Sequence, residues 1–150
     1  MGSESFICPL CADAGGLLIA QSADWRVIRV LDAPDFPAFY RLIWRSHVAE
    51  FSELSPAQRC DCIEAVNVIE QVLRRALRPT KINLASLGNV VPHLHWHVVA
   101  RFDWDSHFPA PIWGAAARVV PGGAAARLAV DLLSLDGQVH DALLLAGRVK

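Results

Sequence analysis

The sequence has no excess of charge of either sign. Its 150 residues carry 14 Lys and Arg against 15 Asp and Glu, a formal net charge of -1 with neutral histidines. Proteins that bind long nucleic acids usually present a basic surface to the phosphate backbone, so we expect no such partner. The apolar content of 53% and the charged content of 19% are typical of one ordered globular domain with a proper core.

The sequence also lacks a long hydrophobic run. No window reaches the roughly 18 apolar residues that a transmembrane helix needs. The first five residues, Met1-Gly2-Ser3-Glu4-Ser5, contain neither a basic region nor an apolar stretch like those of secretory signal peptides. We therefore expect a cytoplasmic protein without a membrane partner.

Cysteines are few, and the four present fall into two close pairs. Cys8 and Cys11 have the C-x-x-C spacing, whereas Cys60 and Cys62 lie in a predicted helix. Residues two apart on a helix point in different directions, so the second pair is interpreted as ordinary buried cysteines. The first pair lacks the strand–helix context of a thioredoxin-like redox site. It is better explained as half of a metal site, for which histidines could supply the other half.

Three of the six histidines alternate with apolar residues in the segment His93-Leu94-His95-Trp96-His97. A period of two predicts a strand with the histidines on one face and the apolar side chains packed into the core behind them. The alternative is a half-buried strand whose polar residues simply face water. Thr, Lys or Glu would serve that role better, because imidazoles are costly to bury without partners. The segment is therefore the leading candidate for a functional site.

The remaining pattern predicts a small α+β domain. A long helix is expected over residues 55–78. Ser55 can cap its start, Pro56 fits its first turn and Gln58 completes a capping box. Residues 81–85 and the histidine strand are expected to form an antiparallel hairpin, because a short connection joins them. Three earlier strands are expected at residues 17–20, 25–31 and 39–44.

The C-terminal third is less regular. Residues 102–113 form a loop rich in aromatics and proline, which either packs on its own domain or covers a site or a second subunit. We expect a domain over residues 1–114 and a helical extension over residues 115–150. A helical stretch at 124–135 should be broken at Asp136-Gly137. The extension shows no residues with evident chemistry, and His140 is interpreted as a surface or packing histidine.

Residues 93–99 match the pattern H-φ-H-φ-H-φ-φ, where φ is apolar, and so resemble the histidine triad (HIT) family. Members of this family bind nucleotides and act on the α-phosphate as hydrolases or transferases. Residues 88–92 resemble the Gly-Gln/Asn segment before the triad. Residues 43–47 resemble the family's "I-P-K-x-H" strand end, with Trp44 where proline is usual. The resemblance runs from about residue 5 to 113 and points to a bacterial HIT-like branch. It implies a HIT-like antiparallel sheet of about five strands with one long helix, followed here by a helical tail.

The central histidine, His95, is the candidate nucleophile. A neutral imidazole can attack phosphorus and form a labile phosphoramidate, which divides one difficult step into two. One ring nitrogen must then be free and the other anchored to a carbonyl. His97 is placed to donate a hydrogen bond to the phosphate or the departing group, and the resemblance supports both roles. Asn89 and the backbone at Gly88 can donate to phosphate oxygens, with Asn83 as a weaker candidate.

The resemblance also implies a metal site and a ribose contact. In several HIT branches and related nucleotidyl transferases, a C-x-x-C pair, the "I-P-K-x-H" histidine and the first triad histidine bind one zinc. The matching positions are Cys8, Cys11, His47 and His93, which would make a closed tetrahedral site. Otherwise the cysteines are reduced packing residues and His47 simply hydrogen-bonds within the site. In either case His47 and His93 also count among the candidate catalytic residues. Asp32 lies where the family places a ribose-binding acid or amide, or is an ordinary turn aspartate.

The expected function is hydrolysis of a nucleotide phosphoester or phosphoramidate through a nucleotidyl-His95 intermediate. Dinucleoside polyphosphates and adenosine phosphoramidates are the expected substrates, with no organic cofactor. Nucleotidyl transfer to an acceptor other than water, a nucleotide-binding module without turnover, and a purely structural zinc module remain alternatives. A homodimer is expected from the resemblance. The apolar surface of the helix at 55–78 and of the aromatic loop also favours one. Trp113 would then lie near nucleotide bound to the partner, unless the loop packs on its own subunit.

Overall fold

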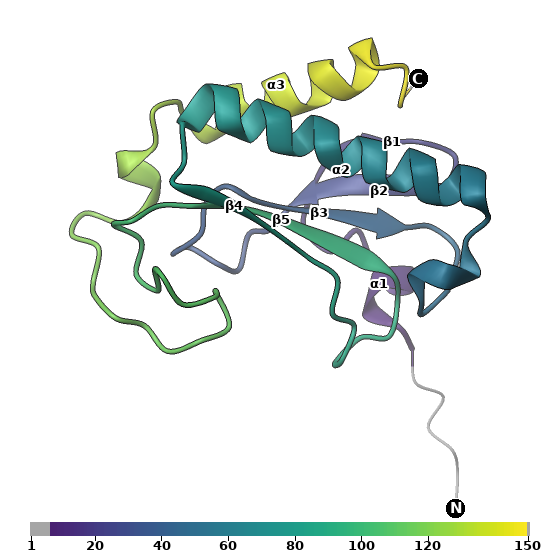
Figure 1. Cartoon of the computed structure of the whole chain (residues 1–150), viewed down its shortest axis with the longest axis horizontal. Coiled ribbons are helices and arrows are strands. Elements are labelled where there is room, and N and C mark those ends of the chain that lie inside the picture. Colours follow the sequence, from purple (N-terminus) through teal and green to yellow (C-terminus); the bar gives the residue numbers. More distant parts are fainter. Residues whose placement is uncertain (1–6, 150) are drawn as a thin grey trace, which may run out of the picture.

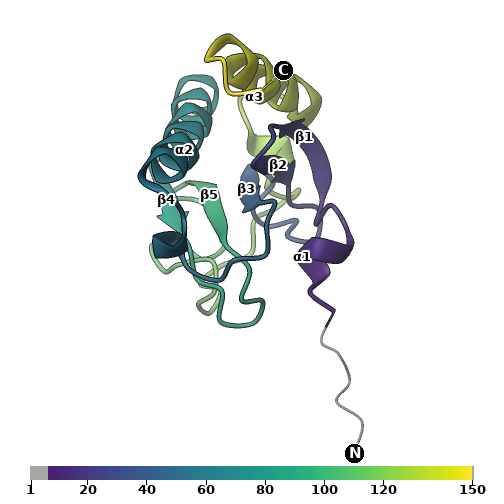
Figure 2. The same ribbon diagram turned by 90° about the vertical axis from the view of Figure 1, so that its right-hand side faces the viewer.

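The chain folds into one five-stranded antiparallel sheet with two helices on one face (Figures 1 and 2). The computed structural model describes residues 7–149, so Met1 to Ser5, on which the expectation of no signal peptide rests, lie outside the described part. The α+β class and the number of strands agree with the sequence-based prediction. The strands, in sheet order, are β1 (Leu17–Gln21), β2 (Trp25–Arg29), β3 (Phe39–Trp44), β5 (His95–Arg101) and β4 (Lys81–Ala85).

The long helix α2 (Pro56–Leu77) begins as its sequence predicts. The Ser55 hydroxyl accepts from the backbone N–H of Gln58, and the Gln58 side chain accepts from the backbone N–H of Ser55. Arg78 ends the helix in the left-handed conformation, at a φ of 48°, directly before Pro79. Cys62 is buried in the contact with the sheet, whereas Cys60 is exposed. The prediction that both are buried is therefore wrong for Cys60, which lies on the solvent side of α2.

The C-terminal helix differs most from the prediction. Residues 124–131 contain only the short η2 (Ala125–Arg127), and just the last four residues of the predicted stretch, 132–135, are α-helical. The helix α3 (Leu132–Leu145) instead begins after Asp131, whose carboxylate accepts from the backbone N–H of Ser134, and it continues through Gly137. The predicted break at Asp136-Gly137 is therefore wrong.

Packing explains why α3 passes through a glycine. Leu135, Val139 and Leu143 are fully buried and belong to the same core as α2 and the sheet. A glycine in a helix costs about 1 kcal/mol relative to alanine, which is less than the burial of one large apolar side chain contributes. The extension thus packs on the domain, while the division at residue 114 stays a prediction.

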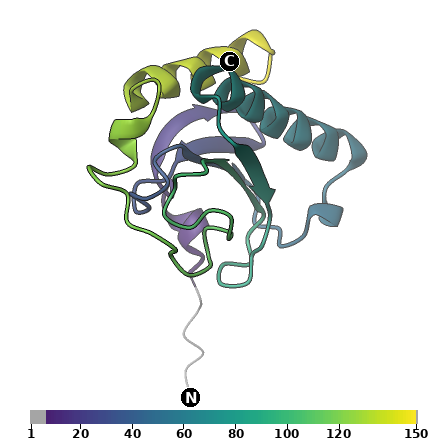
Figure 3. The same ribbon diagram turned by 60° about the vertical axis from the view of Figure 1, so that its left-hand side comes forward.

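The two faces of the sheet have different roles. One face packs against α2 and α3 and holds the larger core, including Trp25, Tyr40 and Trp44. The other carries a smaller apolar cluster, which includes Phe39 and Ile43. The short helix α1 (Pro9–Ala12) lies on this second side. The long connection from β5 to α3 also runs there before it rises to η2 and α3 (Figures 1 and 3).

Within residues 7–149, none of the helices combines the length and the apolar character needed to cross a bilayer. The cytoplasmic location expected from the sequence stays a prediction.

Candidate active site

A cavity of about 480 Å³ opens on the face of the sheet away from α2 and α3. It combines apolar walls with a few polar groups, as ligand sites commonly do. The histidines of β5 and an arginine of β3 form its base. Its lining consists of Leu10, Arg41, Leu87, Gly88, Asn89, Val90, Val91, His95, His97 and Trp113.

His95 is fixed in a single tautomer by the backbone. Its Nδ1 lies 2.6 Å from the carbonyl oxygen of His93. A carbonyl can only accept, so Nδ1 carries the proton and Nε2 keeps its lone pair. Burial lowers the pKa of His95, and the neighbouring Arg41 cation lowers it further, while the bond to the His93 carbonyl opposes them. The ring is therefore neutral near pH 7 and has a free nitrogen, the condition that a nucleophilic histidine must meet.

His97 lies two residues along β5 on the same face. Its ring meets that of His95 edge to face, with 4.8 Å between centroids and an angle of 84°. Burial, followed by the adjacent His95 and Arg41, lowers the pKa of His97 to about 3. His97 is thus a neutral hydrogen-bonding group near pH 7 and not an imidazolium acid.

The loop between β4 and β5 forms one wall of the cavity, where the polar Asn89 lies among apolar side chains. Gly88 has a φ of 75°, a left-handed conformation that favours glycine, and this turn presents Asn89 to the cavity. The Ser86 hydroxyl donates to the carbonyl of His95 at 2.9 Å and ties the loop to the triad strand. Gly88 and Asn89 therefore lie where the sequence predicts, beside the two histidines.

Two other predicted nucleotide contacts lie outside the cavity lining. Asp32 is exposed in the loop after β2, where its charge acts on Arg41 and raises the pKa of that guanidinium against the larger effect of burial. Asn83 lines a neighbouring hollow, and its side-chain oxygen accepts from Arg101 at 2.8 Å.

The aromatic loop packs on its own chain and brings Trp113 to the site. The Trp113 ring lies 5.2 Å from the ring of His97 and remains 53% exposed. A buried ion pair fixes the start of the loop. Both side chains are 2% exposed, with Arg101 Nε 2.8 Å and Nη2 3.0 Å from the Asp105 carboxylate. Sequence reasoning missed this pair, although an Arg and an Asp four residues apart at a strand end were visible.

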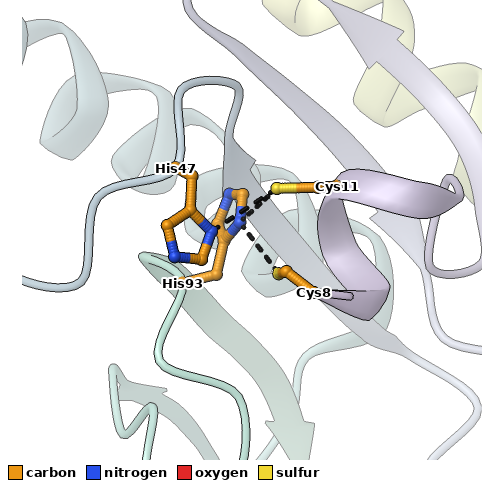
Figure 4. A group of neighbouring side chains, drawn as sticks. All are labelled: Cys8, Cys11, His47 and His93. Carbon is orange, nitrogen blue, oxygen red and sulfur yellow. Dashed lines mark hydrogen bonds between the residues drawn. The ribbon is translucent and has the colours of Figure 1, made fainter. Parts of the chain in front are cut away.

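Cys8, Cys11, His47 and His93 come together beside the cavity, at the end of β3 (Figure 4). Their ligand atoms all lie within 4.8 Å of one another. His93 Nδ1 is 3.4 Å from each of the two sulfurs, and His47 Nδ1 is 3.4 Å from the sulfur of Cys11. Tetrahedral zinc with Zn–S of about 2.3 Å and Zn–N of about 2.0 Å would separate sulfur from nitrogen by roughly 3.5 Å. The four side chains fit a zinc ion with little rearrangement.

The protonation of His93 also fits a metal ligand. Its Nε2 lies 2.6 Å from the carbonyl oxygen of Trp44, so Nε2 carries the proton and Nδ1 directs its lone pair at the two thiols. His93 and His47 thus belong to the Cys/His group and are not among the side chains that line the cavity. His93 contributes to the cavity through its backbone carbonyl, which anchors the ring of His95.

Arg41 is the site residue that sequence reasoning missed. It lies opposite His97 in the pairing of β3 with β5, and its Nε is 3.3 Å from His97 Nδ1. A signal was present, because Arg41 is the one charged residue in the apolar strand Phe39–Trp44. The strand pairing that places it beside His97 could not be read from the sequence.

Comparisons with known proteins agree with this geometry. The model of the HIT domain family matches residues 18–104, more than half of the chain. A histidine triad protein from Bradyrhizobium japonicum is 24% identical, covers 88% of this chain and 90% of its own, and has a TM-score of 0.65. One from Sinorhizobium meliloti is 23% identical, with coverage of 95% and 100% and a TM-score of 0.69.

A zinc-bound histidine triad protein from Mycobacterium smegmatis is 21% identical, with coverage of 97% and 98% and a TM-score of 0.58. No curated protein matches the sequence. Members of the matched family are generally nucleotide hydrolases or transferases. With its family match, its sheet and its triad on β5, this chain belongs to the HIT domain family.

Proposed function

We propose that this protein hydrolyses nucleotides at the α-phosphate through a covalent intermediate on His95. The observation that carries the proposal is the bond from His95 Nδ1 to the His93 carbonyl, which leaves the other ring nitrogen free at the base of the cavity. Within residues 7–149, His95 Nε2 has no hydrogen-bond partner, so nothing in this part of the chain competes with a phosphorus atom for its lone pair.

The reaction follows from this arrangement. The lone pair of His95 Nε2 attacks the α-phosphorus, and the bond from phosphorus to the leaving group breaks with its electron pair on that group. The ring gains positive charge, which the His93 carbonyl stabilises through Nδ1–H. Water then attacks the phosphoramidate and releases the nucleoside monophosphate and the histidine. One water is consumed per turnover, and no redox step occurs.

Hydrogen-bond donors around the phosphate would stabilise the charge that moves during transfer. Asn89 and the backbone at Gly88 line the cavity together with His95, which supports the role expected for both. We assign to His97 a hydrogen bond to a phosphate oxygen or to the leaving group. Asp32 remains a candidate for the ribose, because it lies near Arg41 at the edge of the site. Asn83 is the weaker candidate, since Arg101 already occupies its side-chain oxygen.

Dinucleoside polyphosphates and adenosine phosphoramidates are the proposed substrates. Leu87, Val90, Val91 and Trp113 offer an apolar surface for a nucleobase next to the histidines. Transfer of the nucleotidyl group to an acceptor other than water shares the first half-reaction and is the second candidate.

We further propose one structural zinc per chain, held by Cys8, Cys11, His47 and His93. The short sulfur–nitrogen distances and the tautomer of His93 support it. A closed set of four ligands leaves no position for substrate. The ion would hold the N-terminal segment to β3 and fix the carbonyl of His93 that anchors His95.

The test of the hydrolase is removal of the nucleophile. His95→Asn should lower kcat by at least about 10⁴-fold on a panel of adenine nucleotides, because no second step can begin without the phosphoramidate. Nucleotide binding by calorimetry and the circular dichroism spectrum should stay near wild type. His140→Asn is the matched control, because His140 is an exposed histidine on α3 and should keep full activity.

Acid-quenched wild-type protein should carry a nucleotidyl group on His95 by peptide mass spectrometry. A phosphoramidate on another histidine, or an active His95→Asn variant, would refute the mechanism. Binding without turnover of any nucleotide in the panel would favour the non-catalytic binding module instead.

A homodimer is proposed as the assembly. β4 is an edge strand of the sheet, and its Leu84 is 44% exposed. Leu87 and Trp113, both more than half exposed, lie on the hollows beside it. A second copy would cover this apolar edge.

A further inference from the structure

Arg41 lies beside the two cavity histidines but has no role in the proposed transfer reaction. It lies in the middle of β3, directly opposite His97, and shares a face of the sheet with Phe39 and Ile43. Its guanidinium lies over the Phe39 ring, 5.1 Å from the ring centre, and its Nε approaches His97 Nδ1 at 3.3 Å. Phe39 also packs against the His97 ring at 5.4 Å. The arginine and the histidine are therefore held on one aromatic support.

The direction of this hydrogen bond determines the protonation of His97. A guanidinium has only donors, so Arg41 donates and His97 Nδ1 accepts with its lone pair. A neutral imidazole carries one proton, which must then be on Nε2. His97 and His95 thus have opposite tautomers, since His95 is protonated on Nδ1. The difference matters chemically, because His95 offers a lone pair at Nε2, whereas His97 offers a proton at Nε2.

Among the described residues that line the cavity, Arg41 is the single Lys or Arg, so His97 has no second cationic donor there. Without Arg41, the His97 ring could exchange its proton between the two nitrogens. It would then present a lone pair to a phosphate oxygen for part of the time, and two acceptors repel each other.

We infer that Arg41 is a positioning residue for the transfer reaction: it holds His97 as the Nε2–H tautomer, so that His97 donates a hydrogen bond to the substrate. The inference rests on the proposed function for its catalytic consequence. The tautomer itself can be observed without substrate, so the two can fail separately.

The direct test uses the ring nitrogens of ¹⁵N-labelled protein in long-range ¹H–¹⁵N correlation spectra at pH 7. Wild-type His97 should show a protonated Nε2 and an unprotonated Nδ1, with the signals assigned by their loss in His97→Gln. In Arg41→Met the tautomers should mix or reverse. In Arg41→Lys, whose ammonium can donate to Nδ1, the wild-type tautomer should return at least in part. The His95 signals report whether the strand is intact, because they should keep Nδ1 protonated in every Arg41 variant.

The kinetic test asks whether kcat follows the His97 tautomer across the same variants. Arg41→Met should lower kcat by roughly 10–100-fold, the usual effect of losing a group that orients a reacting side chain. Arg41→Lys should recover part of that loss in parallel with the tautomer. Arg75→Met removes the same charge from an exposed position on α2 and should change neither kcat nor the spectra.

Two results would overturn the inference. One is a wild-type His97 protonated on Nδ1, which needs no variant to be folded. The other is an unchanged His97 tautomer in Arg41→Met. If the tautomers behave as expected but no nucleotide is turned over, the proposed function fails and the role of Arg41 as the group that sets the His97 tautomer stands.

Discussion

Three histidines of one motif have three different environments, and each follows from a single partner atom. The Trp44 carbonyl turns the lone pair of His93 toward the thiols, and the His93 carbonyl turns the lone pair of His95 into the cavity. The Arg41 donor leaves His97 with a proton to give. Spacing alone therefore identifies the group, but the partners determine what each member does.

The zinc proposal makes a prediction at this scale. Cys8→Ser should remove most of the bound zinc and lower the melting temperature by roughly 10 °C. We expect the loss of the zinc to lower the free energy of unfolding by about 3 kcal/mol. For a domain of this size, each kcal/mol lowers the melting temperature by about 2–4 °C. Elemental analysis of freshly purified protein and thermal unfolding measure the two effects.

The chain provides a matched control for this variant. Cys60→Ser changes an exposed cysteine on α2 and should leave both zinc content and melting temperature unchanged. A wild-type protein that contains no zinc and melts at the same temperature with and without a chelator would contradict the proposal.

At the residue scale, the sequence predicts which side chains belong to a site better than it predicts which side chains contact one another. It singled out all four members of the Cys/His group, which the structure brings together. It missed Arg41, because the contact of that residue with His97 arises only when β3 pairs with β5. Asn83 shows the same limit, since its side chain is turned to Arg101, 18 residues away.

Among the elements, α2 and α3 show when nearby residues are enough to predict a helix and when they are not. Ser55, Pro56 and Gln58 specify the start of α2 without help from the rest of the fold. α3 depends on tertiary contacts instead. Asp136, interpreted as a helix breaker, accepts from Tyr40 Oη at 2.7 Å and from Arg29 Nε at 2.9 Å on the sheet. Those partners lie about 100 residues earlier, so no local window could predict that Asp136 helps to dock the helix.

The loop after β5 depends on one carboxylate. Asp105 accepts from Arg101 and from the backbone N–H groups of Phe102, His107 and Phe108. Burial raises the pKa of Asp105, but these hydrogen bonds and the Arg101 charge outweigh it and hold the pKa below its usual value. A carboxylate whose pKa is depressed by folding contributes stability above its unfolded pKa, about 3.9, and loses it as the pH falls through the folded value.

Asp105→Asn should therefore destabilise the protein in a pH-dependent manner. At pH 7 the free energy of unfolding should fall by about 3 kcal/mol, because Arg101 is left buried without its anionic partner. Below about pH 4 the difference from wild type should shrink as the wild-type carboxyl becomes protonated. Urea unfolding at several pH values measures this, with Asp103→Asn in the exposed part of the loop as the control. A difference that stays constant from pH 7 to pH 3 would show that the charge of Asp105 is not what stabilises the loop.

For the whole molecule, both edge strands of the sheet contact a helix on one face and leave leucines exposed, Leu17 and Leu18 on β1 and Leu84 on β4. The β4 edge differs because it lies beside the cavity, with the exposed Leu87 and Trp113 next to it. Exposed edge strands invite pairing with another chain, and natural monomers usually protect them with charge. Here Lys81 begins β4, but the following residues are mostly apolar. The edge beside the cavity is thus the surface on which we expect a second copy.

Light scattering should accordingly give twice the chain mass of 16.4 kDa at micromolar concentration. Leu84→Lys should shift the protein to a monomer, because a charge in the centre of the edge would be buried without a partner. Leu133→Lys changes an apolar residue that is 82% exposed on α3 and should leave the dimer intact. A mass of one chain at every concentration up to the millimolar range would refute the dimer. A dimer that persists in Leu84→Lys but dissociates in Leu133→Lys would move the interface to the helical face, where it could no longer bring a second chain to the edge of the cavity.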